Sequence, residues 1–289
     1  MRAFALLGLV LVAVVIVLWV AIARTGLAKG PVTDAALHGL AVPDDPEARV
    51  LLERWRDRAR RWRMLGGLPL ATGVAVASVA LRSEVQIGFG GAPLWSDPLV
   101  MGLLGAFAGT IGAELHHLRQ RWDGPRTVSL APRELDDYRP RGARRRTLVL
   151  VGVAVAVALA HVAVPVADGL PLPGLLGVAV AGSVLAVQHA IVGRPRPALP
   201  DHLAAADDAV RRLAIRSVDA AGAGSVLLLI LWQVSAITRA TVPATSLFAA
   251  ITALVYLGFA ILALVWWRRG GPATLLTHAA EERHGAVVR

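Results

Sequence analysis

The stretch that decides the fold runs from residue 143 to residue 194 and reads ARRRTLVLVGVAVAVALAHVAVPVADGLPLPGLLGVAVAGSVLAVQHAIVGR. It contains two apolar runs, 147–167 and 170–192, separated only by Asp168 and Gly169. A helix needs roughly 20 predominantly apolar residues to cross the hydrocarbon core of a membrane, and each run has about that length. The break between them contains the residues typical of a tight turn between antiparallel helices. The stretch therefore predicts a membrane-spanning helical hairpin.

Similar apolar runs recur outward from this hairpin along a chain of 289 residues that is 56% hydrophobic, with a mean hydropathy of +0.60. We therefore predict an all-α, polytopic transmembrane helix bundle of about seven spans. The spans are expected at residues 4–23, 65–81, 98–117, 147–167, 170–192, 220–238 and 246–267, of which the second is the shortest. The expected domains are an N-terminal anchor, a basic cytoplasmic segment, a six-span bundle and a cytoplasmic tail, at residues 1–23, 24–64, 65–268 and 269–289.

The basic residues predict an orientation for this bundle. Of the thirty Lys and Arg residues, twenty-seven fall in four segments that alternate with apolar runs: nine in 24–63, nine in 119–146, five in 194–216 and four in 268–289. The other three, Arg2, Arg82 and Arg239, fall on the opposite side. By the positive-inside rule, the N-terminus is expected outside and the C-terminus in the cytoplasm.

The first span is expected to be a retained anchor. Residues 21–23 have the A-x-A form of a signal-peptide cleavage site, which is the alternative interpretation. However, the apolar run is longer than a usual signal-peptide core of about 7–15 residues. Cleavage and export would also place every arginine-rich loop outside, against the charge rule.

The composition excludes several kinds of chemistry. The chain has no cysteine, which removes disulfides, thiolate nucleophiles and cysteine-ligated metal centres. Lys29 is the only lysine, so a Schiff-base mechanism has a single candidate in a loop. The net charge of +10 does not predict nucleic-acid binding, because the arginines flank apolar spans instead of forming one face. Arginine in place of lysine, with abundant Ala, Val and Gly, indicates a GC-rich genome. With the predicted spans, we therefore expect a multi-pass protein of the cytoplasmic membrane of a high-GC bacterium.

Residues 45–63 predict an amphipathic helix that Asp45 caps. Its apolar positions recur at helical spacing, and arginines cover the rest: Leu51, Trp55, Ala59 and Trp62 against Arg54, Arg56, Arg60, Arg61 and Arg63. Such a helix could lie at the headgroup level of an anionic cytoplasmic leaflet, or simply continue as a charged flank into the second span. It could also dock a cytoplasmic protein partner. The candidate membrane-surface or partner contacts are Trp55, Trp62, Arg54, Arg58 and Arg61.

Polar residues inside the predicted spans are the candidate functional contacts. His161 and Gln233 lie at similar depths of the fourth and sixth spans and could form a hydrogen bond, either as a substrate contact or as a clip between helices. Tyr256 is a further candidate in the seventh span. The others are expected near the cytoplasmic ends of the third and fifth spans, where they could reach water: Glu114, His117, Gln188 and His189. Glu114 and His117 share a helix face, but too few ligands accompany them to predict a metal site.

Two further patterns concern packing and repetition. Gly105 and Gly109 form a G-x-x-x-G pair that predicts close helix packing, inside the bundle or against another chain. Three Asp-Asp pairs, beginning at residues 44, 136 and 207, each precede arginines and a pair of spans. They could mark a repeat, but chance clustering of charges between spans explains them as well. The proline-containing segments 119–146 and 193–200 are expected to be partly extended.

The sequence contains no catalytic, cofactor-binding or metal-binding motif, so we expect neither an enzyme nor a cofactor. The first hypothesis is a non-catalytic accessory, scaffold or regulatory component of the cytoplasmic membrane. The second is a small transporter or permease for an apolar or lipid-like solute, with a site near His161, Gln233 or Tyr256. The expected partners are the anionic leaflet and a protein at the cytoplasmic face, but no nucleic acid.

Overall fold

The computed structural model describes most of the chain between residues 32 and 241 and a few residues beyond. The described residues are 32–80, 98–119, 126–127, 134–140, 142–163, 171–194, 196–197, 200–241, 258, 261, 262, 265, 269–272 and 274–276. Their elements are α2 Asp34–Gly39, α3 Pro46–Ala80, α4 Pro98–Arg119, β1 Arg126–Thr127, the short 3-10 helix η2 Leu135–Asp137, α5 Ala143–Ala163, α6 Leu172–Gly193, β2 Arg196–Pro197 and α7 Asp201–Thr241. Apart from the two-residue antiparallel pair of β1 and β2, the regular structure is helical, which confirms the all-α prediction. That pair also agrees with the expected extended backbone in both connecting segments.

Three helices in the described part are long and apolar enough to cross a membrane: Ala143–Ala163, Leu172–Gly193 and Leu203–Thr238. They contain most of the fourth and fifth predicted spans and all of the sixth, and the third helix begins well before residue 220. The second and third predicted spans are helical, in α3 and α4, but are not among these three. The first span at 4–23 and most of the seventh, with Tyr256, lie outside the described residues. Membrane-spanning helices are thus supported by length and composition.

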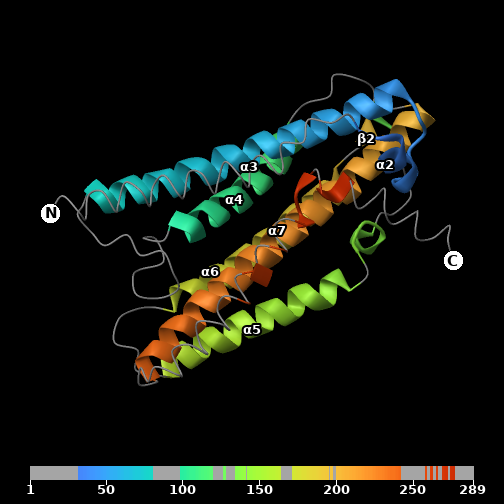
Figure 1. The fold of residues 1–289 in the computed structure, drawn as a ribbon. Coiled ribbons are helices and arrows are strands. Elements are labelled where there is room, and N and C mark those ends of the chain that lie inside the picture. The colour runs from blue at the N-terminus through green and yellow to red at the C-terminus, as the bar shows by residue number, and fades with distance from the viewer. Residues whose placement is uncertain are drawn as a thin grey trace.

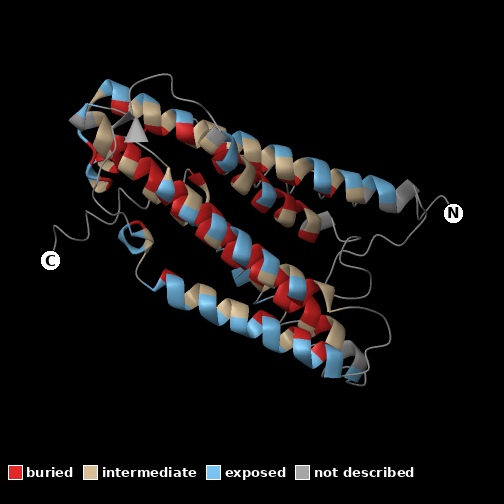
Figure 2. Cartoon of the chain, turned by 180° about the vertical axis from the view of Figure 1, so that it is seen from behind, coloured by how far each residue is buried: buried red, intermediate tan, exposed pale blue. Residues whose placement is uncertain are grey.

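Helix α7 is the centre of the bundle (Figure 1). It contacts α3, α4, α5 and α6, while α3 packs mainly on α4. Of the most apolar 18-residue stretch in each candidate span, 72% is buried in α7, 44% in α6 and only 17% in α5. Figure 2 shows the same gradient from the buried α7 to the exposed α5. Among the described helices, α5 therefore forms an edge of the bundle.

Glycines allow α3 and α4 to touch backbone to backbone. A Cβ atom built on Gly66 would lie 2.1 Å from the carbonyl oxygen of Gly105, and one on Gly109 would lie 2.1 Å from that of Trp62. Both distances are shorter than any side chain tolerates, so only glycine fits. The predicted close packing at Gly105 and Gly109 is thus confirmed, and its partner is α3 of the same chain.

Of the two interpretations of residues 45–63, the structure agrees with the charged flank that continues into the second predicted span. They belong to one continuous helix, α3, whose 35 residues extend about 50 Å and run straight into the second predicted span. Leu52, Trp55 and Ala59 are 0%, 1% and 2% exposed. These three residues are therefore covered by the protein's own helices, because an amphipathic pattern specifies an apolar neighbour without specifying which one.

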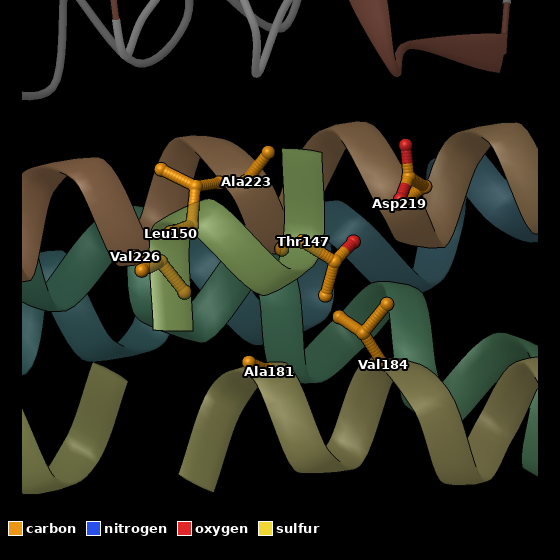
Figure 3. Close-up of a pocket in the computed structure, with 8 residues that line it drawn as sticks. Thr147, Leu150, Ala181, Val184, Asp219, Ala223 and Val226 are labelled. Carbon is orange, nitrogen blue, oxygen red and sulfur yellow. The ribbon is translucent and has the colours of Figure 1, made fainter. Parts of the chain in front are cut away.

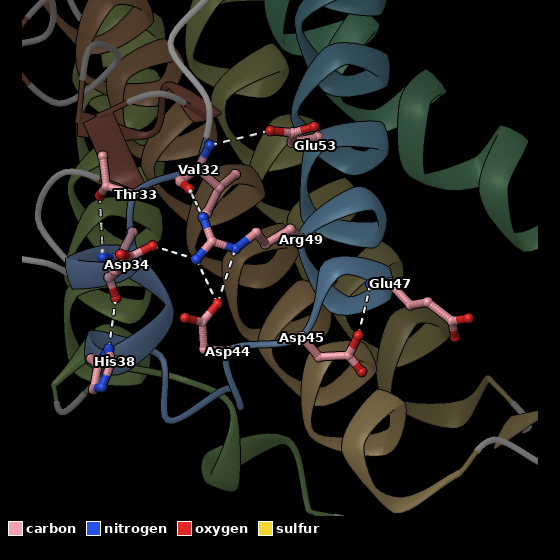
Figure 4. Close-up of polar contacts among 10 residues, drawn as sticks. Val32, Thr33, Asp34, His38, Asp44, Asp45, Glu47, Arg49 and Glu53 are labelled. Carbon is pink, nitrogen blue, oxygen red and sulfur yellow. Dashed lines mark hydrogen bonds and ion pairs between the residues drawn. The ribbon is translucent and has the colours of Figure 1, made fainter.

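Residues 32–45 fold back onto the start of α3 around Arg49 (Figure 4). The Arg49 guanidinium pairs with both Asp34 and Asp44, and its Nη1 donates to the carbonyl oxygen of Val32 at 3.4 Å. The backbone amide of Val32 in turn donates to Glu53 Oε1 at 3.2 Å. These contacts place α2 against the charged half of α3.

Candidate functional site

An open groove of about 560 Å³ follows one face of α3 where its arginine-rich half meets its apolar half. Eight of its lining residues come from α3 and one from the end of α4: Val50, Glu53, Arg54, Asp57, Arg58, Arg61, Trp62, Leu65 and His116. Residues spaced by three or four along a helix share a face, which is why three arginines line one groove. The groove therefore places the positive charge of three arginines next to the aromatic ring of Trp62 and the apolar side chain of Leu65.

The two carboxylates in the groove already have partners. Glu53 accepts a hydrogen bond from the amide of Val32, and Asp57 pairs with Arg56 at 3.3 Å. By contrast, Nε and Nη2 of Arg58 are shielded from solvent and have no hydrogen-bond partner among the residues that the structure describes. These two nitrogens form one edge of the guanidinium, the edge that binds carboxylates and phosphates with two parallel hydrogen bonds. Arg58, which lines the groove, thus has a shielded donor pair without an acceptor among the described residues.

Beneath the groove, Glu114 is surrounded by more positive than negative charge. It is 4% exposed and accepts a hydrogen bond from Trp55 Nε1 at 3.3 Å. Arg58, Arg63 and Arg194 all act on it electrostatically. Burial lowers the pKa of Arg58 and of Arg194, and it lowers that of Arg63 to about 10, while the charge of Glu114 opposes each shift. One buried acidic side chain therefore lies among three arginines.

The side chain of Trp62 lies between α3 and α4 and forms one wall of the groove. Its ring centroid lies 5.5 Å from that of His116, at an interplanar angle of 40°. A Cβ on Gly112 would lie 3.1 Å from the Trp62 ring, so glycine leaves room for the indole. Leu65, 67% exposed, continues the same face on its apolar side. The groove therefore combines charge, an aromatic wall and an exposed apolar end.

The predicted surface contacts separate into two groups. Arg54 and Arg61 are exposed and Arg58 and Trp62 are half-buried, and all four line the groove. Trp55 is instead buried against Glu114 and is not a membrane-surface or partner contact. Its helical spacing from Leu52 and Ala59 reflects the protein core.

Most of the polar residues predicted inside the spans form hydrogen bonds with other parts of the same chain. Gln233 is fully buried, and its Oε1 accepts from the amide of Gly174 at 3.2 Å, near the start of α6. Gln188 is also fully buried: its Oε1 accepts from Arg139 Nε at 3.0 Å, and its Nε2 donates to the carbonyl of Ile215 at 3.5 Å. For Gln188 and Glu114, the expectation that they reach water is wrong, because neighbouring helices cover both.

The histidines behave differently from one another. His161 is 7% exposed and therefore buried in the bundle, whereas His189 is exposed and its Nδ1 lies 2.8 Å from the carbonyl oxygen of Leu185 one turn earlier. His117 is half-buried. Gln233 bonds to the α6 backbone, which favours the interpretation of Gln233 as a clip between helices.

The sequence did not lead us to predict the buried hydrogen bonds that Arg63 forms with distant parts of the chain. Arg63 is 6% exposed; its Nε donates to Thr110 Oγ1 at 2.9 Å, and its Nη2 donates to Ser217 Oγ at 2.9 Å and to the carbonyl of Gly270 at 2.6 Å. It therefore joins α3, α4, α7 and a C-terminal segment. The helical spacing of Trp55, Ala59 and Arg63 was the available signal that Arg63 is on the buried face and not the polar one.

Asp219, on α7, is 4% exposed and pairs with Arg146. It lines a cavity of about 10 Å³ between α5, α6 and α7, with Thr147, Ala181 and Val184 among its neighbours (Figure 3). A cavity of this size holds about one water molecule.

A second buried ion pair joins Asp207 and Arg211 at 2.9 Å. Arg211 Nη1 also donates to the carbonyl oxygen of Ile191, which connects α7 to the end of α6.

In the part of the chain that the structure describes, no three His, Cys, Asp or Glu residues are grouped to hold a metal ion. Comparison of the chain with protein-family models, with characterised proteins and with solved structures found no match.

Proposed function

We propose that this chain is a multi-pass protein of the cytoplasmic membrane that acts as a non-catalytic accessory or scaffold subunit. In this proposal it has seven spans, with the N-terminus outside and the C-terminus in the cytoplasm, as the distribution of arginines predicts. Its activity is to hold a companion membrane protein. The surface that meets this companion is the outer face of α5.

The exposure pattern of α5 carries the proposal. Gly152, Ala156 and Ala160 are exposed, and their four-residue spacing places them on one face of the helix. Within the described part of the chain, a Cβ on Gly152 would meet no atom within 4 Å. The opposite face, with Ala154 and Ala158, is buried within the chain. Small residues at this spacing allow a second helix to approach closely, as in membrane helix dimers.

The polar groups inside the bundle support the same proposal. Gln188, Gln233, Arg63 and Asp219 hold the chain's own helices together, so these side chains act in packing. This favours a structural role over a transport pathway through them.

Crosslinking in the native membrane tests the proposal. A photo-crosslinking residue at position 156 is expected to capture a companion protein in constant stoichiometry. Gly152→Leu should reduce that capture at least about tenfold by blocking close approach. Val162→Leu is the matched control, because Val162 is also exposed on α5 but lies roughly a third of a turn away. Capture of lipid alone, or equal loss in both variants, would contradict the proposal; solute flux that depends on His161 would favour a transporter.

A further inference from the structure

The groove on α3 lies at a definite depth relative to the apolar part of the helix. From Met64 to Ala80, α3 has no charged residue. Arg61 and Arg58 precede Met64 by three and six residues, or about 4.5 and 9 Å along the helix axis. The headgroup layer of a bilayer is about 5–7 Å thick on each side of the hydrocarbon core. Arg61 therefore falls within the layer of lipid phosphates, and Arg58 lies just beyond it, one turn further along the same face of the helix.

We propose that this groove binds the phosphate of an anionic phospholipid from the cytoplasmic leaflet. Arg58 and Arg61 donate to the phosphate oxygens, while Trp62 and Leu65 contact the glycerol and the first part of the acyl chain. The inference rests on the proposed crossing of residues 65–81 and on the cytoplasmic position of the charged half of α3. It does not depend on the α5 interface.

Three observations select a phosphate-bearing lipid. The donor edge of Arg58 has no acceptor, and the groove's two carboxylates are held by Val32 and Arg56. Glu114 beneath the groove faces three arginines, so an anion gains attraction there. Along α3 the groove passes from arginines to the apolar Leu65. A phospholipid has the same sequence of groups, with a charged phosphate followed by an apolar acyl chain. Charge and polarity thus match a phospholipid along the helix.

Lipid binding to the purified, full-length protein tests this inference. Native mass spectrometry from a neutral detergent, with added phosphatidylglycerol, would measure affinity for wild type and variants. Arg58→Gln/Arg61→Gln should weaken binding about 30-fold, from the loss of two arginine contacts. Arg60→Gln/Arg145→Gln removes the same charge from residues that do not line the groove, and should change affinity less than twofold.

Several outcomes would overturn the inference. Equal loss in both double variants would show general charge attraction and no site. Displacement of the lipid by millimolar inorganic phosphate would assign the groove to a soluble phosphate. Because Arg58 is partly buried, Arg61→Gln is measured alone as well; unchanged affinity in that folded variant would also contradict the site. Capture of a companion at position 156 is read separately, so failure here and failure of the scaffold proposal can be told apart.

Discussion

At the scale of single residues, the main departure from the sequence-based expectation is a charged side chain that is buried and hydrogen-bonded inside the protein. Arg63 has the sequence context of a surface arginine, between Trp62 and the start of an apolar run. In the structure it is buried and donates to groups on α4, α7 and the C-terminal segment. An arginine can make these contacts because its guanidinium presents several donors in a rigid plane. Arg63 is therefore a structural tie between distant parts of the chain.

Replacing Arg63 should consequently destabilise the protein. Arg63→Ala is expected to cost about 2–4 kcal/mol, because it removes charged hydrogen bonds and leaves the Gly270 carbonyl without this donor. This corresponds to a fall of roughly 5–15 °C in melting temperature, measured in detergent by thermal unfolding. Arg63→Lys keeps the charge but not the fork of donors, so it should recover only part of the loss.

The exposed Arg145 provides the control for that experiment. Arg145→Ala should stay within about 0.5 kcal/mol of wild type, as surface substitutions usually do. A melting temperature for Arg63→Ala equal to that of Arg145→Ala would show that the buried contacts contribute nothing measurable.

At the scale of helices, packing depends on where glycine stands. On α4, Gly105 and Gly109 lie against the backbone of α3. Gly73, on α3 itself, has no atom of the described residues within 4 Å of its Cβ position. The sequence shows these glycines as equivalent small residues. Only the helix crossing distinguishes those that are required from those that are not.

This difference predicts opposite effects of one substitution. Gly109→Ala should destabilise by about 1–3 kcal/mol, because the added methyl group forces α3 and α4 apart. Gly73→Ala should be neutral or stabilise by up to about 1 kcal/mol, since alanine favours a helix and meets open space. Thermal unfolding in detergent measures both, and equal destabilisation by the two substitutions would refute the close crossing.

At the scale of the whole molecule, the arginine-rich ends of the helices define one side of the bundle. Helix α5 begins with Arg144, Arg145 and Arg146, and α7 carries Arg211, Arg212 and Arg216 in its first half. Burial decreases from α7 through α6 to α5, so the molecule has a packed centre and an open edge. The proposed companion fits that edge, and the proposed lipid fits the groove on α3.

The proposed orientation can be measured directly, because the chain has no cysteine of its own. In intact cells, a membrane-impermeant maleimide should label Thr241→Cys at the outer end of α7. It should label Arg145→Cys only after the membrane is permeabilised. The reverse pattern would invert the orientation, and labelling of both residues in intact cells would contradict the crossing itself.

The sequence alone determined the helical class and the positions of the most apolar helices, 143–163, 172–193 and the later part of α7. These are local properties, since a helix satisfies its backbone hydrogen bonds within one segment and hydropathy is read from the same residues. Tertiary structure alone decided which faces meet protein and which remain open. Trp55, Arg63 and Glu114 were expected near the surface, but residues as far as 207 positions along the chain bury them. An amphipathic pattern cannot make this distinction, because lipid and a neighbouring helix are equally apolar partners.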